Sequence, residues 1–213
     1  RKMGGLFNKI PFTGTMMWIG SLAIIGFPYF SGYYSKESIL ENAYFSSLAI
    51  GNYAYIVGIL TALLTAFYSW RLLFLTFHGV SRVSNTFFES IKESPKVMLA
   101  PLFFLALGSI FSGILLSEYF IGTKQDNFWH NSIVLNNSGY HYMPFAQTLI
   151  IKSSVAIGIL FAALIYFYKT NLSKYLSTNF RPIYSFSLNK WYIDELYNTL
   201  IVKPYFFISS FFW

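Results

Sequence analysis

Three long apolar runs dominate the chain, at residues 53–77, 97–117 and 148–168. An α-helix needs about 20 residues to cross the hydrocarbon core of a bilayer, so each run is long enough for one transmembrane helix. The pattern therefore predicts an all-α, polytopic membrane protein.

A fourth apolar region, residues 11–50, is too long for one straight crossing and is interrupted by the sequence GFPYFSG. Gly26, Pro28 and Gly32 weaken or end a helix there, because glycine is conformationally free and proline lacks a backbone N–H. We expect one broken transmembrane helix in this region, with Ser35 as the N-cap of its second half.

The basic residues favour one broken crossing over two separate crossings. Short loops on the cytoplasmic or matrix side of a membrane are enriched in Lys and Arg. With four crossings, only Lys124 and Lys152 fall on the opposite side. The positive side, with both chain ends, receives Arg1, Lys2, Lys9, Arg82, Lys92, Lys96, Lys169, Lys174, Arg181 and Lys190. We therefore expect about four crossings, because an extra one would scramble this asymmetry.

The remaining segments are polar or amphipathic. Residues 1–10 form a polar lead-in, and residues 118–147 have the polar, Asn-rich composition of a surface loop. Residues 187–213 are expected to begin an amphipathic helix that lies on the membrane. Its two faces follow from helical spacing: Leu188, Tyr192, Leu196 and Leu200 on one, and Lys190, Asp194 and Asn198 on the other.

Composition supports a membrane protein and argues against other classes. Of the 213 residues, 55% are hydrophobic and 11% are charged, about half the charged share of a soluble domain. The net charge of +7 does not indicate a nucleic-acid partner, because the basic residues stand singly between apolar runs. The chain has no cysteine, so iron–sulfur clusters and cysteine zinc sites are excluded, and no cofactor or metal is expected in it.

The stretch GYYSKESIL places Lys36 and Glu37 inside the broken crossing. Ionisable residues at membrane depth are costly and by default indicate an ion or proton pathway. Desolvation and the helix dipole of the second half disfavour a charged Lys36, whereas Glu37 and the last carbonyls of the first half favour it. We therefore predict that Lys36 and Glu37 transfer protons.

Four further residues are candidates for the proton path. Glu41 follows Glu37 by one helical turn, so it could compete for the proton or relay it. Thr61 and Thr65 share a face of the 53–77 crossing and could hold water, although helix hydroxyls commonly bond to their own backbone, and a structural role is the better expectation. His78 lies at the membrane edge and can exchange a proton near neutral pH.

Four segments occur in order along the chain: RKMGGL, GFPYFSGYYSKESIL, TAFYSWRLLFLTFHG and WYIDELYNTLIVKP. Together they resemble the C-terminal part of subunit 5 of respiratory NADH:ubiquinone oxidoreductase (complex I), called subunit L in bacteria, over essentially the whole chain. The resemblance implies a proton-pumping, antiporter-like subunit in which Lys36 matches the key lysine of the second broken helix. It also implies that WYIDELYNTLIVKP enters a lateral helix along neighbouring pump subunits.

The resemblance also sets expectations for function and partners. The chain is expected to translocate protons in the membrane arm, while flavin, iron–sulfur clusters and quinone belong to other subunits of the enzyme. Expected partners are other membrane-arm subunits, lipids and a chain that supplies the N-terminal half; a split gene and a fragment of a longer chain both stay open. The abundance of Phe, Tyr, Ile, Asn and Lys favours the mitochondrial inner membrane, with a bacterial cytoplasmic membrane as the alternative.

Two other functions stay open from the sequence. The chain could be a structural clamp of the same arm, which supplies helix packing with little proton traffic through Lys36. It could also belong to a multisubunit cation/proton antiporter or a membrane hydrogenase, whose large subunits share the broken-helix motif. The tail WYIDELYNTLIVKP favours the respiratory complex over these.

Overall fold

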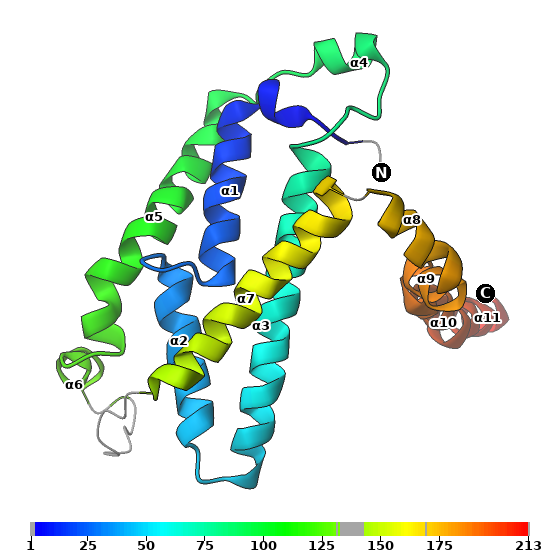
Figure 1. Ribbon diagram of the computed structural model, residues 1–213. Coiled ribbons are helices and arrows are strands. Elements are labelled where there is room, and N and C mark those ends of the chain that lie inside the picture. The colour runs from blue at the N-terminus through cyan, green and yellow to red at the C-terminus, as the bar shows by residue number, and fades with distance from the viewer. Residues whose placement is uncertain (1–2, 131, 133–142, 169, 213) are drawn as a thin grey trace. The chain divides into compact units, whose positions relative to one another are not determined.

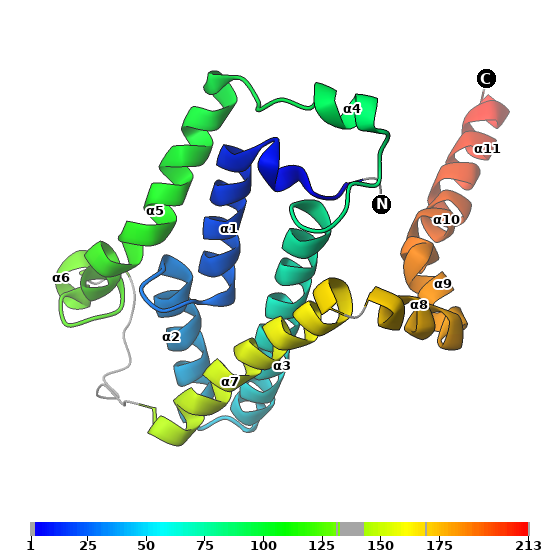
Figure 2. The ribbon, with the colours of Figure 1, turned by 45° about the horizontal axis from the view of Figure 1, so that its top comes forward.

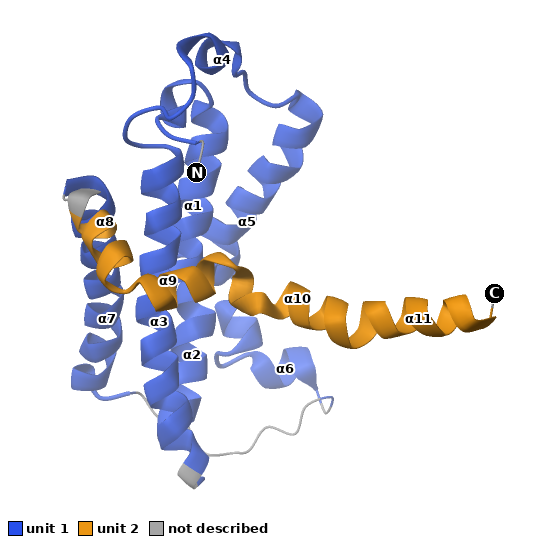
Figure 3. Cartoon of the chain, turned by 90° about the vertical axis from the view of Figure 1, so that its right-hand side faces the viewer, with its two compact units in different colours: residues 1–168 blue, residues 169–213 orange. Residues whose placement is uncertain are grey.

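A computed structural model describes residues 3–130, 132, 143–168 and 170–212. Within these residues all regular elements are helices (Figure 1). They fall into two compact units, Arg1–Tyr168 and Lys169–Trp213, which Figure 3 distinguishes by colour.

The broken crossing forms two helices, α1 (Pro11–Ile25) and α2 (Ser31–Phe45), which follow one another in Figure 1. α1 ends at Gly26, whose φ of +78° suits glycine because it has no Cβ. The N–H of Gly26 bonds to the carbonyl of Ala23 at 3.1 Å, and the N–H of Phe27 bonds to that of Leu22 at 3.0 Å. This Schellman-type cap and the following turn at Pro28 separate the two helices.

Two details of the break differ from the prediction. α2 begins at Ser31 with Phe30 as its N-cap, so the expectation that Ser35 caps the second half is wrong. The Ser35 hydroxyl instead donates to the carbonyls of Ser31 and Gly32, at 3.5 and 3.4 Å. Gly32 lies inside α2, where a Cβ would collide with the carbonyl oxygen of Ala23. Gly32 therefore allows α2 to lie close to the end of α1, because it has no Cβ.

Three further helices in the described ranges are long and apolar enough to cross a membrane. Their bounds exceed the apolar runs at several ends, because a helix continues into polar positions such as Asn52, Glu118 and Gln147 when its backbone bonds can still form. They are α3 (Ala49–Thr76), α5 (Lys96–Phe120) and α7 (Phe145–Ala163), which continues into the π-helical turn η2 (Leu164–Tyr168).

Short helices occupy the segments between the crossings. The lead-in contains a 3₁₀ turn, η1 (Leu6–Asn8), and α4 (Asn85–Ser90) lies between α3 and α5. The segment expected to be a loop, 118–147, contains the end of α5, the short helix α6 (Gln125–Trp129) and the start of α7. Residues 131 and 133–142 of that segment lie outside the described residues.

α7 packs along α3, whereas α1 and α2 contact both α3 and α5 (Figures 1 and 2). At Gly158 in α7, a Cβ would collide with the carbonyl oxygen of Leu63 in α3, so glycine lets these backbones approach closely. A small buried cluster of Leu40, Tyr55 and Ile151 joins α2, α3 and α7. These contacts fix how α7 faces the broken helix.

A distant carboxylate caps the N-terminus of α1. Glu93 Oε1 accepts bonds from the backbone N–H groups of Phe12 and Thr13, at 2.8 and 3.1 Å, and Oε2 accepts one from Thr13 Oγ1 at 2.7 Å. The first N–H groups of a helix have no intrahelical partner and carry the positive end of its dipole, so a carboxylate stabilises them. Glu93 thereby ties the start of α1 to the segment before α5.

The second unit is a succession of helices rather than one helix starting at 187. Lys190, Trp191 and Tyr192 have φ values of 54°, 62° and 55°, which end one helix and start another. A π-helical turn then precedes Pro204, which has no N–H for a regular α-helical bond. The elements are α8 (Thr170–Asn179), α9 (Arg181–Leu188), η3 (Lys190–Tyr192), α10 (Ile193–Tyr197), η4 (Asn198–Val202) and α11 (Lys203–Phe212).

Candidate functional site

Lys36 reaches back across the break to the end of α1. Its side chain is half-buried, and its Nζ donates a hydrogen bond to the carbonyl oxygen of Ile25, the last residue of α1, at 3.2 Å. Carbonyl groups at a helix C-terminus lack intrahelical partners and carry the negative end of the helix dipole, so they stabilise an ammonium group. The break thus supplies a backbone acceptor for the Lys36 ammonium.

A cavity of about 250 Å³ lies beside this lysine. Water occupies about 30 Å³ per molecule in the liquid, so the cavity has room for several waters. The polar side chains in its wall are Tyr33, Lys36, Glu37 and Lys152. The remaining wall consists of Ile25, Gly26, Phe27, Pro28, Ile151, Val155, Ala156 and Ile159.

The polar groups of the cavity come from two helices. On α2, the Tyr33 hydroxyl interacts with the Glu37 carboxylate one helical turn later. From α7, Nζ of Lys152 lies over the Tyr33 ring, 5.5 Å from its centre, a cation–π arrangement. The cavity therefore brings together two lysines, one carboxylate and one phenol, groups that can bind and release protons.

Lys152 is the residue that the sequence-based prediction of the site missed. The charge pattern uses it only as a marker of membrane side. A usable signal was nevertheless present, since Lys152 is the single charged residue early in the apolar run 148–168. An ionisable group at membrane depth is the same feature that points to Lys36.

Glu41 lies outside the cavity wall. Its Oε1 accepts a hydrogen bond from the backbone N–H of Met143 at 2.9 Å, just before α7. Close to this bond, the Tyr55 hydroxyl donates to Oε1 of Gln147 at 2.9 Å. These two bonds attach α2 and α3 to the start of α7.

The other three candidates for the proton path also lie away from the cavity wall. The Thr61 hydroxyl donates to the carbonyl of Val57 at 2.7 Å, and that of Thr65 donates to the carbonyl of Thr61 at 2.6 Å. Both threonines therefore bond to their own helix, as hydroxyls in helices commonly do. A role in proton transfer stays a prediction for both.

The His78 ring is surrounded by aromatic side chains. Its centre lies 5.8 Å from that of Phe7, 5.6 Å from that of Trp18 and 6.1 Å from that of Phe74. Its Nδ1 lies 3.4 Å from the carbonyl oxygen of Leu73. This environment packs the ring between the lead-in, α1 and α3, and a proton-path role for His78 also stays a prediction.

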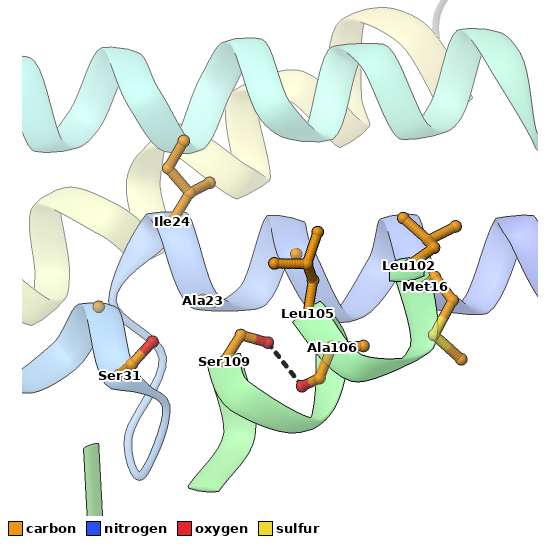
Figure 4. A pocket seen from close by; sticks show the side chains of 10 residues that line it. Met16, Ala23, Ile24, Ser31, Leu102, Leu105, Ala106 and Ser109 are labelled. Carbon is orange, nitrogen blue, oxygen red and sulfur yellow. Dashed lines mark hydrogen bonds between the residues drawn. The ribbon is translucent and has the colours of Figure 1, made fainter. Parts of the chain in front are cut away.

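A second cavity, of about 410 Å³, lies between α1, α2 and α5 (Figure 4). Its wall is formed by apolar residues, glycines and two serines, Ser31 and Ser109. The Ser109 hydroxyl already donates to the carbonyl of Ala106 at 2.8 Å, the bond drawn in Figure 4. The lining offers no titratable group, so proton chemistry points to the smaller cavity. Within the part of the chain that the structure describes, no group of three or more His, Cys, Asp or Glu residues is placed to hold a metal ion.

Two family sequence models match the chain. Residues 68–213 match the NADH dehydrogenase subunit 5 C-terminus. Residues 1–65 match the transmembrane model of NADH:quinone oxidoreductase and the Mrp antiporter. The broken crossing with Lys36 thus lies in the match over residues 1–65, and the helices after α3 lie in the match over residues 68–213.

Curated relatives agree with these matches. NADH-quinone oxidoreductase subunit L of Rickettsia bellii is 41% identical over 210 residues, covering 95% of this chain and 32% of the relative. NADH-ubiquinone oxidoreductase chain 5 is 38% identical in Marchantia polymorpha and 39% in Arabidopsis thaliana, each covering 96% of this chain and 32% of the relative. The chain thus spans about a third of the length of these relatives. Since the C-terminal family model alone accounts for more than half of the residues, the chain belongs to the NADH dehydrogenase subunit 5 family and corresponds to its C-terminal part.

Proposed function

We propose that this chain is a proton-translocating part of the membrane arm of NADH:ubiquinone oxidoreductase. The observation that carries the proposal is the half-buried Lys36, which is bonded to the carbonyl of Ile25 and lies beside a cavity large enough for water. The relatives named NADH-ubiquinone oxidoreductase chain 5 and NADH-quinone oxidoreductase subunit L support the same assignment.

Lys36 acts as the proton-binding group in this proposal. When its amine takes a proton, the Ile25 carbonyl and the end of the α1 dipole stabilise the resulting ammonium. Partial burial of the side chain opposes the charge, because a charged group loses hydration there. One effect thus favours the ammonium form of Lys36 and the other favours the neutral amine. An electrostatic change in neighbouring subunits can shift the balance between these two forms.

The energy for this shift comes from outside the chain in our proposal. NADH oxidation and quinone reduction take place in other subunits, which hold the flavin, the iron–sulfur clusters and the quinone. The partners of the chain are other membrane-arm subunits, lipids and the segment or chain that carries the preceding helices of the family. Both mitochondrial and bacterial relatives match, and we place the chain in the mitochondrial inner membrane, with a bacterial cytoplasmic membrane as the alternative.

The test replaces Lys36 in the assembled complex and measures NADH oxidation and proton uptake in the same membrane vesicles. We expect Lys36→Met to lose proton uptake while the complex still assembles. Lys36→Arg is expected to assemble and also to lose uptake, because a guanidinium stays protonated. Lys96→Met, at the exposed start of α5, is the matched control. Normal proton uptake per NADH in both Lys36 variants would contradict the proposal.

A further inference from the structure

The orientation of Lys152 is fixed by its neighbours on α7. The preceding residue, Ile151, is buried with Leu40 of α2 and Tyr55 of α3. Two turns further along, Gly158 allows the close contact between α7 and the Leu63 carbonyl of α3. With α7 held on both sides of it, Lys152 belongs to the wall of the cavity that contains Lys36.

Each lysine of the cavity has its own site for a positive charge. The ammonium of Lys36 is held by the carbonyl oxygen of Ile25 at 3.2 Å. The ammonium of Lys152 lies over the Tyr33 ring, 5.5 Å from its centre, where the negative face of the ring attracts a cation. The cavity therefore provides two separate stations at which a proton on a lysine is stabilised.

The charges of the cavity favour one proton shared between the two lysines. Among the residues that form its wall, Glu37 is the one carboxylate, and Lys36 and Lys152 are the two amines. With both lysines charged, two like charges would lie along one cavity wall with a single carboxylate to compensate them, which disfavours the second proton. With one lysine charged, the ammonium and the carboxylate balance.

The two stations come from different helices. Lys36 extends from α2 to the carbonyl at the end of α1, whereas Lys152 extends from the second turn of α7 to the Tyr33 ring. Transfer from Lys36 to Lys152 thus moves a proton from the broken helix to α7.

We propose that Lys152 accepts the proton that Lys36 releases, an inference that rests on the function proposed above for Lys36. The N–H bond at Lys36 Nζ breaks, water in the cavity carries the proton, and a new N–H bond forms at Lys152 Nζ. Lys36 becomes a neutral amine and Lys152 an ammonium, so the total charge of the cavity is unchanged. Glu37 and Tyr33 orient the water between the two amines.

The first experiment separates proton transfer by Lys152 from a purely electrostatic role. Lys152→Met removes the charge and the proton site, whereas Lys152→Arg keeps the charge but does not release a proton. In the assembled complex we expect both variants to lose proton uptake per NADH.

Lys124 also stacks on a tyrosine, with Nζ 5.0 Å from the centre of the Tyr119 ring, but it lies outside the cavity wall. Lys124→Met and Lys124→Arg are therefore matched controls, and we expect normal uptake in both.

A second experiment uses the absence of cysteine from the chain. Lys152→Cys introduces a single thiol in it, at a position exposed on this chain. An aminoethyl thiosulfonate attaches a titratable amine there, whereas the trimethylammonium analogue attaches a fixed charge. Rescue of proton uptake by the first reagent alone is the expected result. The unsubstituted complex treated with the same reagents shows their effect on thiols of other subunits.

The outcomes distinguish this inference from the proposed function. Loss of uptake in Lys36→Met with normal uptake in Lys152→Met leaves the role of Lys36 intact and overturns that of Lys152. Loss in Lys152→Met with normal uptake in Lys152→Arg, or equal rescue by both reagents, shows that only the charge matters and also overturns it. If the Met variant fails to assemble, the Arg variant and the two thiol reagents still decide the question.

Discussion

The ammonium of Lys36 in α2 is bonded to the main-chain carbonyl of Ile25, the last residue of α1, across the break in the first crossing. This bond explains why the break and the lysine occur together. An unbroken helix would use that carbonyl for its own N–H four residues later, and the lysine would have no such acceptor. The backbone at Gly26 is therefore part of the proposed proton-binding site as well as of the fold.

Replacing Gly26 by alanine is expected to weaken both the fold and the site. Its φ of +78° is a left-handed backbone conformation that residues with a Cβ rarely adopt. A Cβ at this position would also lie 3.3 Å from Cδ of Lys36. The backbone cost is about 1–2 kcal/mol for an L-residue. A lower midpoint of thermal unfolding of the complex, together with reduced proton uptake per NADH, would fit this expectation.

Gly20→Ala is the matched control for Gly26→Ala. Gly20 lies inside α1, the helix that ends at Gly26, and a Cβ there meets no atom within 4 Å. Because alanine is the better helix former by about 1 kcal/mol, this variant should be neutral or slightly more stable. Equal destabilisation by both substitutions would contradict the special role of Gly26.

The carboxylate of Glu93 should stabilise the start of α1 by bonding to Phe12 and Thr13. Loss of a helix N-cap typically costs about 1 kcal/mol, so Glu93→Ala should lower the thermal midpoint of the complex. A double-mutant cycle with Thr13→Val should show coupling between the two side chains, because one hydrogen bond joins them at 2.7 Å. Glu89→Ala, at an exposed position, serves as the control. Additive effects of the Glu93 and Thr13 substitutions would exclude that bond as a stabilising contact.

The packing of α7 on α3 should depend on Gly158. A Cβ there would collide with the carbonyl oxygen of Leu63 and lie 3.0 Å from Cβ of Ala66. Gly158→Ala should therefore push α7 away from α3 and displace Lys152 from the cavity. We expect lower stability and lower proton uptake than in Gly108→Ala, because a Cβ at Gly108 meets no atom within 4 Å. Matching behaviour of the two variants would argue against close helix contact at Gly158.

The sequence predicts the broken crossing and the three long helices because both depend on local signals. Gly26 followed two residues later by Pro28 favours the end of a helix, and a long apolar run favours a membrane crossing. Lys36 could be found in the same way, as an ionisable residue inside such a run. The start of α2 at Ser31 could not, because several residues near the break can occupy an N-cap and tertiary packing selects among them.

Long-range contacts account for most of what the sequence does not predict. Glu93 caps a helix about 80 residues earlier in the chain, and no local pattern links the two. Lys152 enters the cavity because of the way α7 packs against α2 and α3, which helical periodicity alone does not specify. The left-handed residues 190–192 are a further case, since none of the three is a glycine or an asparagine.

His78 provides a test of whether its aromatic surroundings or its proton matters. A phenylalanine would keep the ring contacts with Phe7, Trp18 and Phe74 but could not carry a proton. Because the ring lies away from the wall of the Lys36 cavity, we expect His78→Phe to keep normal proton uptake per NADH. His78→Ala, which removes the packing, should lower the thermal midpoint instead. Lost uptake in an assembled His78→Phe complex would restore His78 as a member of the proton path.

Replacing Glu41 by glutamine tests whether this residue only anchors α7 or also relays a proton. Its Oε1 accepts a bond from the backbone N–H of Met143 at 2.9 Å, which an amide oxygen can also accept. Glu41→Gln should therefore keep α2 attached to the start of α7, whereas Glu41→Ala should loosen this contact and lower stability.

If Glu41 only anchors α7, the glutamine variant pumps normally in a vesicle assay. If Glu41 relays the proton beyond Lys152, the glutamine variant assembles with normal stability but loses proton uptake, because an amide does not exchange a proton as a carboxylate does. We expect the first result, since the carboxylate lies outside the cavity wall and is already bonded to the backbone.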